Sequence, residues 1–185
     1  LIDPKAERFA VENRRPLMEH VNGVERKRPD GKTERVFVGF RHGLIDKGDT
    51  QDHVDQTTMH VRLIVTACKA EHISDLSPSA VQAAIAEQRN LGRSLRTCNS
   101  YLRSIKTFSR WLVRDGRAPN NPLAHLQAYN QQTDTRYVRR DLMPDELIRL
   151  IRAALSGPAV LGMSGDDRAM AYCLAAGTGF RADEL

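Results

Sequence analysis

Cysteine and long apolar runs are both scarce in this sequence. The three cysteines, Cys68, Cys98 and Cys173, lie in helix-like segments without Cys-x-x-Cys spacing, so we expect small core residues rather than disulfides or a zinc site. No apolar run reaches about 18 residues, and no charged-then-apolar leader opens the chain. We therefore expect no membrane span, no secretion and a cytoplasmic protein.

Acidic residues are almost absent from one part of the chain. The whole sequence has 28 Lys and Arg against 23 Asp and Glu, a net charge of +5 that by itself only weakly suggests a polyanionic partner. Residues 89–140, however, contain eleven basic residues and only two acidic ones, Asp115 and Asp134. This segment has a net charge of +9, which leaves −4 for the rest of the chain. Basic charge is thus concentrated where it could meet phosphate.

Apolar residues recur at helical spacing in most segments, so the chain is predicted to be mainly α. The expected helices cover residues 4–20, 41–47, 50–69, 77–90, 95–114, 143–156 and 164–176. The pair Ser77-Pro78 predicts one helix start, and Ser94 another. Alternation with period 2 is confined to residues 25–40, where Arg28-Pro29-Asp30-Gly31-Lys32 has turn chemistry. A β-hairpin and a loop leading into a helix both fit that pattern.

Residues 95–114 form the most informative predicted helix, because two stripes separate around its axis. The apolar stripe contains Leu95, Cys98, Tyr101, Leu102, Ile105, Phe108 and Leu112. The basic stripe, at steps of three or four residues, contains Arg96, Asn99, Arg103, Lys106, Arg110 and Arg114. No acidic residue interrupts the basic stripe, whereas a solvated helix face usually mixes charges of both signs. A phosphate-binding surface and an ordinary solvated face are the two interpretations.

The segment that follows is predicted to be a linker. Residues 127–140 are polar, poor in aliphatic side chains and without a helical period. Their Arg136, Arg139 and Arg140 suit a segment that lies on a DNA backbone, although a solvated linker fits as well. Helices are expected to begin at Met143 and Ser164. Their apolar side chains are expected to be buried, and these are Leu147, Ile148, Leu150, Ile151 and Leu155 in the first, and Met170, Ala171, Cys173, Leu174 and Ala175 in the second.

The last residues carry the sharpest local signal. Gly177 and Gly179 flank Thr178 and allow a tight turn, after which Arg181 is expected to begin a new helix. A cation in a first helical turn opposes the helix dipole, so its presence there needs a reason. Binding an anion with the exposed amides and the guanidinium is one reason. A simple ion pair with Asp183 or Glu184 is the other.

At this point the sequence resembles the tyrosine recombinases, or phage integrases. One matching block runs from Ser94 to Lys106 and continues with Phe108, Trp111-Leu112, Gly116 and Asn121-Pro122-Leu123. The other contains Asp167-Arg168-Ala169-Met170, Thr178-Gly179-Phe180-Arg181 and Glu184-Leu185, with Phe180 where leucine is commoner. Residues 1–49 fit the family poorly.

The resemblance implies a fold and a division of the chain. It implies a small orthogonal helical bundle of the SAM-like, core-binding type, followed by the first helices of an α+β catalytic domain. We accordingly expect an N-terminal extension over residues 1–49, a DNA-binding domain over 50–126, a linker over 127–142 and the start of the catalytic domain over 143–185.

The resemblance also implies a chemistry, in which a tyrosine attacks DNA and forms a 3′-phosphotyrosyl link without metal or cofactor. Arg181 would be the first catalytic arginine and bind the scissile phosphate, with Glu184 supporting it. Double-stranded DNA would be the partner, with self-association of the full-length protein on it. The implied DNA contacts are Arg96, Asn99, Arg103, Lys106, Arg110, Arg114, Arg136, Arg139 and Arg140.

The family's remaining catalytic residues are absent from this sequence. No histidine begins a His-x-x-Arg motif, and all four tyrosines precede Arg181. We therefore expect an inactive fragment that binds DNA. A stand-alone, non-enzymatic DNA-binding regulator would leave the block around Arg181 unexplained, and a helical protein-interaction domain would leave the +9 segment unexplained.

Overall fold

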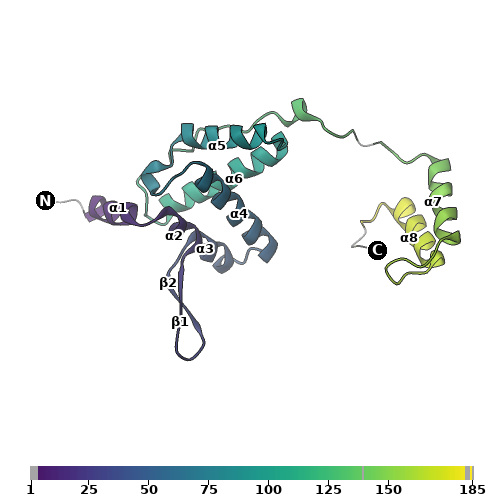
Figure 1. Ribbon diagram of the computed structural model, residues 1–185, viewed down its shortest axis with the longest axis horizontal. Helices are drawn as coiled ribbons and strands as arrows, with labels where there is room; N and C mark the ends of the chain where they lie inside the picture. The colour runs from purple at the N-terminus through teal and green to yellow at the C-terminus, as the bar shows by residue number, and fades with distance from the viewer. Residues whose placement is uncertain (1–3, 139, 182–183, 185) are drawn as a thin grey trace. The chain divides into compact units, whose positions relative to one another are not determined.

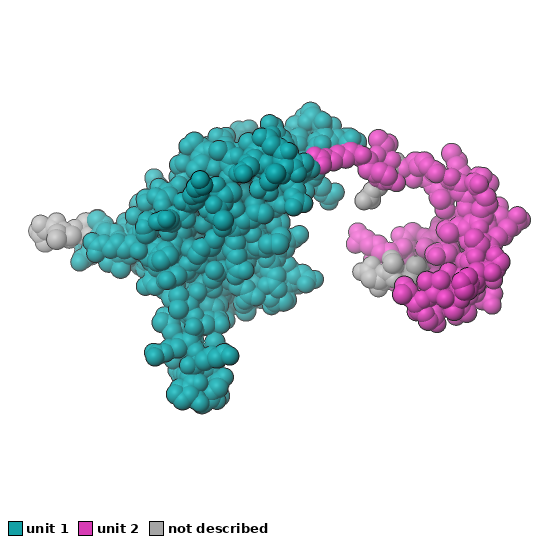
Figure 2. All heavy atoms as spheres, viewed as in Figure 1, with its two compact units in different colours: residues 1–135 teal, residues 136–185 magenta. Residues whose placement is uncertain are grey.

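The computed structural model describes residues 4–138, 140–181 and 184. The chain divides into two compact units, residues 1–135 and 136–185 (Figure 2). Most of the described residues are helical, which confirms the mainly α prediction. The first unit contains α1 (Pro4–Arg14), α2 (Leu17–Asn22), β1 (Val24–Lys27), β2 (Thr33–Phe37), α3 (Phe40–Asp46), α4 (Gln51–Ala67), the 3-10 helix η1 (Ile73–Asp75), α5 (Pro78–Asn90), α6 (Leu95–Arg114) and the 3-10 helix η2 (Gln131–Asp134) (Figure 1). The second contains α7 (Pro144–Ser156) and α8 (Gly165–Thr178).

Two of the predicted helix starts, at Ser77 and Ser94, are confirmed by side-chain caps. The hydroxyl of Ser77 accepts a hydrogen bond from the Ala80 amide at 3.2 Å, and that of Ser94 accepts one from the Thr97 amide at 3.1 Å. Each cap satisfies one of the amides that a helix start leaves without an intrahelical partner.

The core of the first unit forms around α6. Its predicted apolar stripe is buried from Cys98 to Leu112, while Leu95, in the first turn, is only half-buried. α4 packs along it and contributes Val54, Val61 and Ile64, each with no exposed surface. The 3.6-residue period of the sequence therefore predicted the buried face of α6 correctly.

The N-terminal segment belongs to this same core. Leu17, Val21, Phe40 and Leu44 are buried in it, and the ring of Phe40 meets that of Phe108 edge to face, with centroids 5.4 Å apart. The expected boundary at residue 49 therefore does not separate two packing units. α2 and α3 fill space beside α4 that the predicted 50–126 domain would leave exposed.

The sequence left a hairpin and a loop open for residues 25–40, and the structure shows a hairpin. β1 and β2 pair antiparallel, with Glu25 opposite Arg35, Arg26 opposite Glu34 and Lys27 opposite Thr33. Only the two ends at the base of the ribbon, Val24 and Phe37, are half-buried, and the other strand residues are exposed.

The second unit is a pair of packed helices, and its burial differs from the prediction. Only Ala154 and Ala169 are buried among its described residues. Ile148 is 48% exposed, Leu155 51% and Met170 61%. The apolar faces predicted to be buried are therefore largely exposed, because each helix has a single helical neighbour in the described part of this unit. No helix in the described residues is long and apolar enough to cross a membrane.

Candidate nucleic-acid interface

Four arginines lie along the exposed side of α6. Arg96, Arg103, Arg110 and Arg114, which we call the arginine line, follow one another at steps of seven, seven and four residues and are all exposed. Whole helical turns separate them, so they project from one side of the helix over about 27 Å. This length is slightly less than one turn of B-form DNA, about 34 Å.

The arginine line has no internal charge compensation. Within the described chain, no carboxylate forms an ion pair with any of its four guanidinium groups. α6 itself contains no acidic residue, and Asp115, which follows it, is bound by Arg117 at 2.6 Å. Four like charges on one line repel one another, and a bound polyanion would relieve that repulsion.

Asn99, a predicted DNA contact, instead has a structural role. It is only 5% exposed, its amide nitrogen donates to the Tyr129 carbonyl at 2.9 Å, and its amide oxygen accepts from the Tyr129 amide at 2.7 Å. Both polar ends of the side chain are therefore occupied, and Asn99 fastens the chain after α6 back onto that helix. This corrects its assignment as a DNA-facing residue.

Lys106 is half-buried, and its side chain also makes hydrogen bonds within the protein. Its ammonium donates to the carbonyls of Ala124 at 2.9 Å and Leu126 at 2.6 Å. An ammonium has three donors, so one is left for an anion. Lys106 thus holds the loop that contains Ala124 and Leu126 on α6, and its remaining donor can add positive charge to the interface.

The predicted linker is partly attached to the first unit. The Leu95 amide donates to the Asp134 carboxylate at 2.7 Å, so residues up to η2 stay on α6. Of the three linker arginines, Arg136 is exposed and Arg139 lies outside the described residues. Arg140 makes a two-pronged pair with Glu146, at 2.7 Å to each oxygen, and this pair lowers the pKa of Glu146 below its usual value. Arg140 therefore holds the start of α7.

Shallow recesses flank the arginine line, and among the described residues no Asp or Glu lines them. One, of about 150 Å³, lies between α4 and α6 and contains His53, His60 and Arg103. Burial lowers the pKa of His60 and so favours its neutral form, and its Nδ1 lies 3.2 Å from the Ser104 hydroxyl. Arg103 also lines the recess on the other side of α6, of about 290 Å³, and can donate to an anion in either one.

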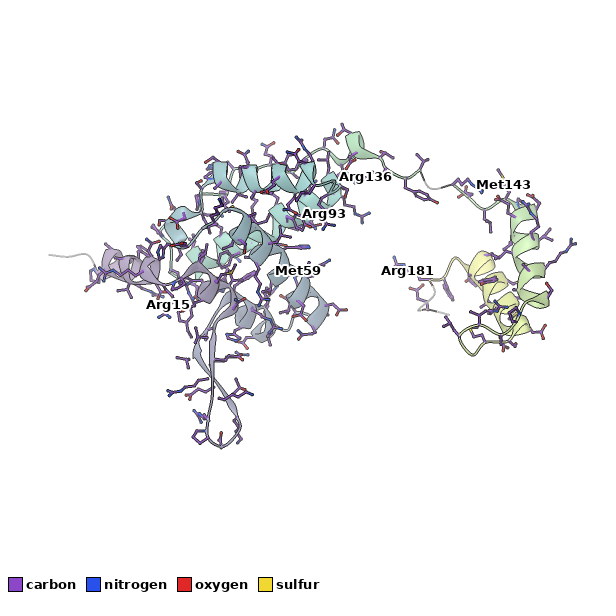
Figure 3. All side chains as sticks on the ribbon, in the orientation of Figure 1. Arg15, Met59, Arg93, Arg136, Met143 and Arg181 are labelled. Carbon is purple, nitrogen blue, oxygen red and sulfur yellow. The ribbon has the colours of Figure 1, made fainter. Side chains whose placement is uncertain are left out.

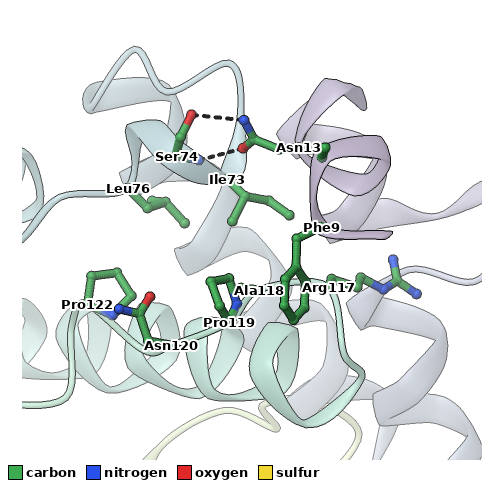
Figure 4. A pocket seen from close by; sticks show the side chains of 11 residues that line it. Phe9, Asn13, Ile73, Ser74, Leu76, Arg117, Ala118, Pro119, Asn120 and Pro122 are labelled. Atoms are coloured by element: carbon green, nitrogen blue, oxygen red, sulfur yellow. Dashed lines mark hydrogen bonds between the residues drawn. The ribbon is translucent and has the colours of Figure 1, made fainter. Parts of the chain in front are cut away.

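A larger cavity, of about 410 Å³, lies away from these cations. It is lined by α1, η1 and the loop after α6 (Figure 4), with Phe9 and Ile73 in its wall. Asn13 closes one side, because its amide donates to the Ser74 hydroxyl at 3.3 Å and accepts from the Ser74 backbone amide at 2.8 Å. None of the arginine line reaches this cavity.

Arg117 belongs to the basic segment, but its side chain is buried in the first unit. It is 7% exposed, its Nη2 donates to the Val38 carbonyl at 2.6 Å, and its Nη1 lies 3.1 Å from Nδ1 of His20. Its guanidinium also lies over the Phe37 ring at 4.5 Å from the centroid. The residues around Arg117 in the sequence do not distinguish it from the exposed arginines, because its partners His20 and Val38 are 97 and 79 residues away.

The turn before Arg181 is confirmed. Gly179 ends α8 with a φ of 71°, in the left-handed region that glycine adopts without strain, and the Thr178 hydroxyl accepts from the Phe180 amide at 3.2 Å. Gly177, by contrast, lies inside α8, where an added Cβ would meet nothing within 4 Å. Gly177 is therefore part of the helix, and the turn forms at Gly179.

Arg181 is exposed and lies beyond the end of α8 (Figure 3). Its backbone amide donates to the Glu184 carboxylate at 2.9 Å, and the Glu184 amide donates to the Arg181 carbonyl at 2.9 Å. Glu184 thus contacts the backbone of Arg181 rather than pairing with its guanidinium. The new helix predicted here, and the alternative partner Asp183, fall on residues 182, 183 and 185, outside the described residues.

Searches of the chain against protein-family models, curated proteins and solved structures find no match. The arginine line and the turn around Arg181 are therefore the features from which a function can be proposed. The first is a row of four exposed guanidinium groups on one side of one helix. The second presents one exposed guanidinium next to a tight backbone turn.

Proposed function

We propose that this protein binds duplex DNA through the arginine line of α6. The observation that carries the proposal is the set of four exposed guanidinium groups on one side of one helix, without a carboxylate partner among the described residues. Phosphate contacts of this kind supply affinity but no sequence information. Binding is therefore salt-dependent and only weakly selective for sequence.

We further propose that the chain is the DNA-gripping N-terminal part of a cytoplasmic tyrosine recombinase. The resemblance of residues 94–123 and 167–185 to that family supports this, as do the cap at Ser94 and the left-handed turn at Gly179 within those blocks. The first unit then corresponds to the SAM-like core-binding bundle. Arg181 is the arginine that contacts the scissile phosphate.

The DNA-binding proposal is tested with the double variant Arg103→Glu/Arg110→Glu. A matched control, Arg14→Glu/Lys69→Glu, changes the net charge equally at two exposed cations outside α6. We expect the α6 variant to lose duplex binding and the control to retain most of it, in titrations of labelled DNA between about 50 and 200 mM salt. Equal affinities of the two variants, or wild-type binding that does not weaken over this salt range, would contradict the proposal.

The role of Arg181 is tested in a protein that carries this segment together with the remaining catalytic residues. Arg181→Ala should leave DNA binding nearly unchanged, because its contact is strongest when the phosphate becomes pentacoordinate. Removing one such stabilising donor typically lowers the rate by about 100-fold to 1000-fold. A suicide DNA substrate that traps the phosphotyrosyl product measures this, and unchanged trapping would remove Arg181 from the catalytic site.

A further inference from the structure

The β1–β2 hairpin extends away from the helices of the first unit as a two-stranded ribbon (Figure 1). Beyond its base, its strand side chains are exposed on both faces, so it adds little to the hydrophobic core. A two-stranded ribbon has marginal stability by itself in water. A ribbon that contributes so little to packing indicates a surface made for contact with something else.

The base of the hairpin is held firmly on the bundle. Arg117 donates to the Val38 carbonyl at 2.6 Å, and Nη1 of Arg35 donates to both carboxylate oxygens of Asp46, at 2.7 and 2.8 Å. The Nε2 of the buried His42 ring lies 2.7 Å from the Glu25 carboxylate, which accepts its hydrogen bond. These contacts come from α3 and from the loop that follows α6, the helix that carries the arginine line.

The carboxylates of the hairpin are already engaged. Glu34 pairs with Arg28 at 2.8 Å, Glu25 contacts His42, and Asp30 accepts a hydrogen bond from the Lys32 backbone amide at 3.0 Å within the turn. Within the described chain, the side chains of Arg26, Lys27 and Lys32 have no such partner. The ribbon therefore presents cations outward while its anions serve internal contacts.

The strand register places two of these cations, Arg26 and Lys32, on one face of the ribbon. Arg26 is directly opposite Glu34, and residues two apart share a face, so Arg26, Arg28 and Lys32 lie together with Glu34. This face has three cations and one anion. The major groove of B-form DNA, about 12 Å wide, admits a two-stranded β-ribbon.

We propose that the hairpin is a second DNA-binding element that enters the major groove and contacts phosphates through Arg26 and Lys32. This inference rests on the proposed function, because it gives the protein a second surface that contacts the same DNA. The proposed interface then includes both α6 and the hairpin, whose strand residues beyond its base contribute little to the core. Residues 24–37 thereby have a role in binding.

The test compares Arg26→Gln/Lys32→Gln with the charge-matched Arg14→Gln/Lys69→Gln, using the full chain and a labelled duplex. Each phosphate contact contributes about 0.9 to the slope of log affinity against log salt. The hairpin variant should reduce that slope by about 1.8 and the affinity by at least tenfold at about 0.1 M salt, while the control changes the slope little. All four positions are exposed, so thermal unfolding should be unchanged in both variants.

Duplex RNA of the same length separates groove entry from general charge. The major groove of A-form RNA is deep and narrow, so the ribbon cannot enter it, and the hairpin variant should lose less affinity for RNA than for DNA. Replacing residues 28–32 by Asn-Gly, a sequence that forms tight hairpin turns, should weaken DNA binding in the same way. Equal losses on RNA and DNA would overturn the groove assignment.

The pattern of results separates this inference from the proposal it rests on. If the wild-type chain binds DNA, Arg103→Glu/Arg110→Glu weakens it and the hairpin variant matches its control, the hairpin inference alone fails. If the wild-type chain does not bind DNA, both proposals fail together.

Discussion

Replacing Arg117 by alanine tests how the first unit is held together. The Arg117 guanidinium is 7% exposed, and its three nitrogens contact Asp115, His20 and the Val38 carbonyl at 2.6, 3.1 and 2.6 Å. Arg117→Ala removes all three contacts at once. It leaves the Val38 carbonyl and the His20 ring nitrogen without these donors.

The expected cost is large. A polar group left without its hydrogen-bond partner costs about 1–3 kcal/mol, and Arg117→Ala leaves two of them, the Val38 carbonyl and the buried His20 ring nitrogen. Whole domains are stable by about 5–15 kcal/mol, so this variant should be near the limit of folding at 37 °C. Arg117→Lys keeps the charge but cannot reproduce the fork of donors, so its loss should be intermediate.

Urea denaturation measures the loss, and Trp111 supplies a local probe. It is the only tryptophan in the chain, and the Arg117 guanidinium lies over its ring at 4.4 Å. Arg114→Ala, at the exposed last residue of α6, serves as the control and should change the free energy of unfolding by no more than about 0.5 kcal/mol. An unchanged urea slope with a loss below about 1 kcal/mol for Arg117→Ala would refute the role of this arginine as a structural tie.

Three further predictions concern pH and local structure. Burial lowers the pKa of His20 below its usual value of 6.5, so as the pH falls the unfolded chain binds a proton at this histidine before the folded chain does. The contribution of His20 to the free energy of unfolding is therefore full above about pH 6.5 and decreases as the pH falls below it. His20→Gln should flatten the pH dependence of urea unfolding, though not abolish it, because the pKa of His60 is lowered in the same way. Asn99→Ala should cost about 1–3 kcal/mol and speed hydrogen exchange at the Tyr129 amide, and unchanged exchange would contradict the tie between them. Gly116→Ala, at a φ of 69°, should cost about 1–2 kcal/mol by the same urea assay, and Gly116→Asn clearly less, since asparagine tolerates this conformation; equal losses would argue against backbone strain.

The sequence alone predicted the parts of this fold that depend on nearby residues. The two faces of α6 follow from the 3.6-residue period, and its start follows from the hydroxyl of Ser94, which reaches an amide only three residues away. The exposed arginine line was predicted for the same reason. The left-handed turn at Gly179 is likewise a local property, since only glycine adopts that conformation without strain.

Tertiary structure alone decided which polar residues serve the fold. Asn99 belongs to the predicted basic stripe, yet Tyr129, 30 residues later, occupies both of its polar groups. Arg117 and Arg114 are only three residues apart in the same basic segment, but one is buried against His20 and Val38 while the other is exposed.

The same limit explains the errors in burial. An apolar helix face is buried only where other elements pack on it, as α2 and α3 pack beside α4, while the described part of the second unit supplies one neighbour each for α7 and α8. Periodicity shows which face of a helix is apolar. The residues that cover that face are set by contacts between segments far apart in the chain, and no local pattern encodes them.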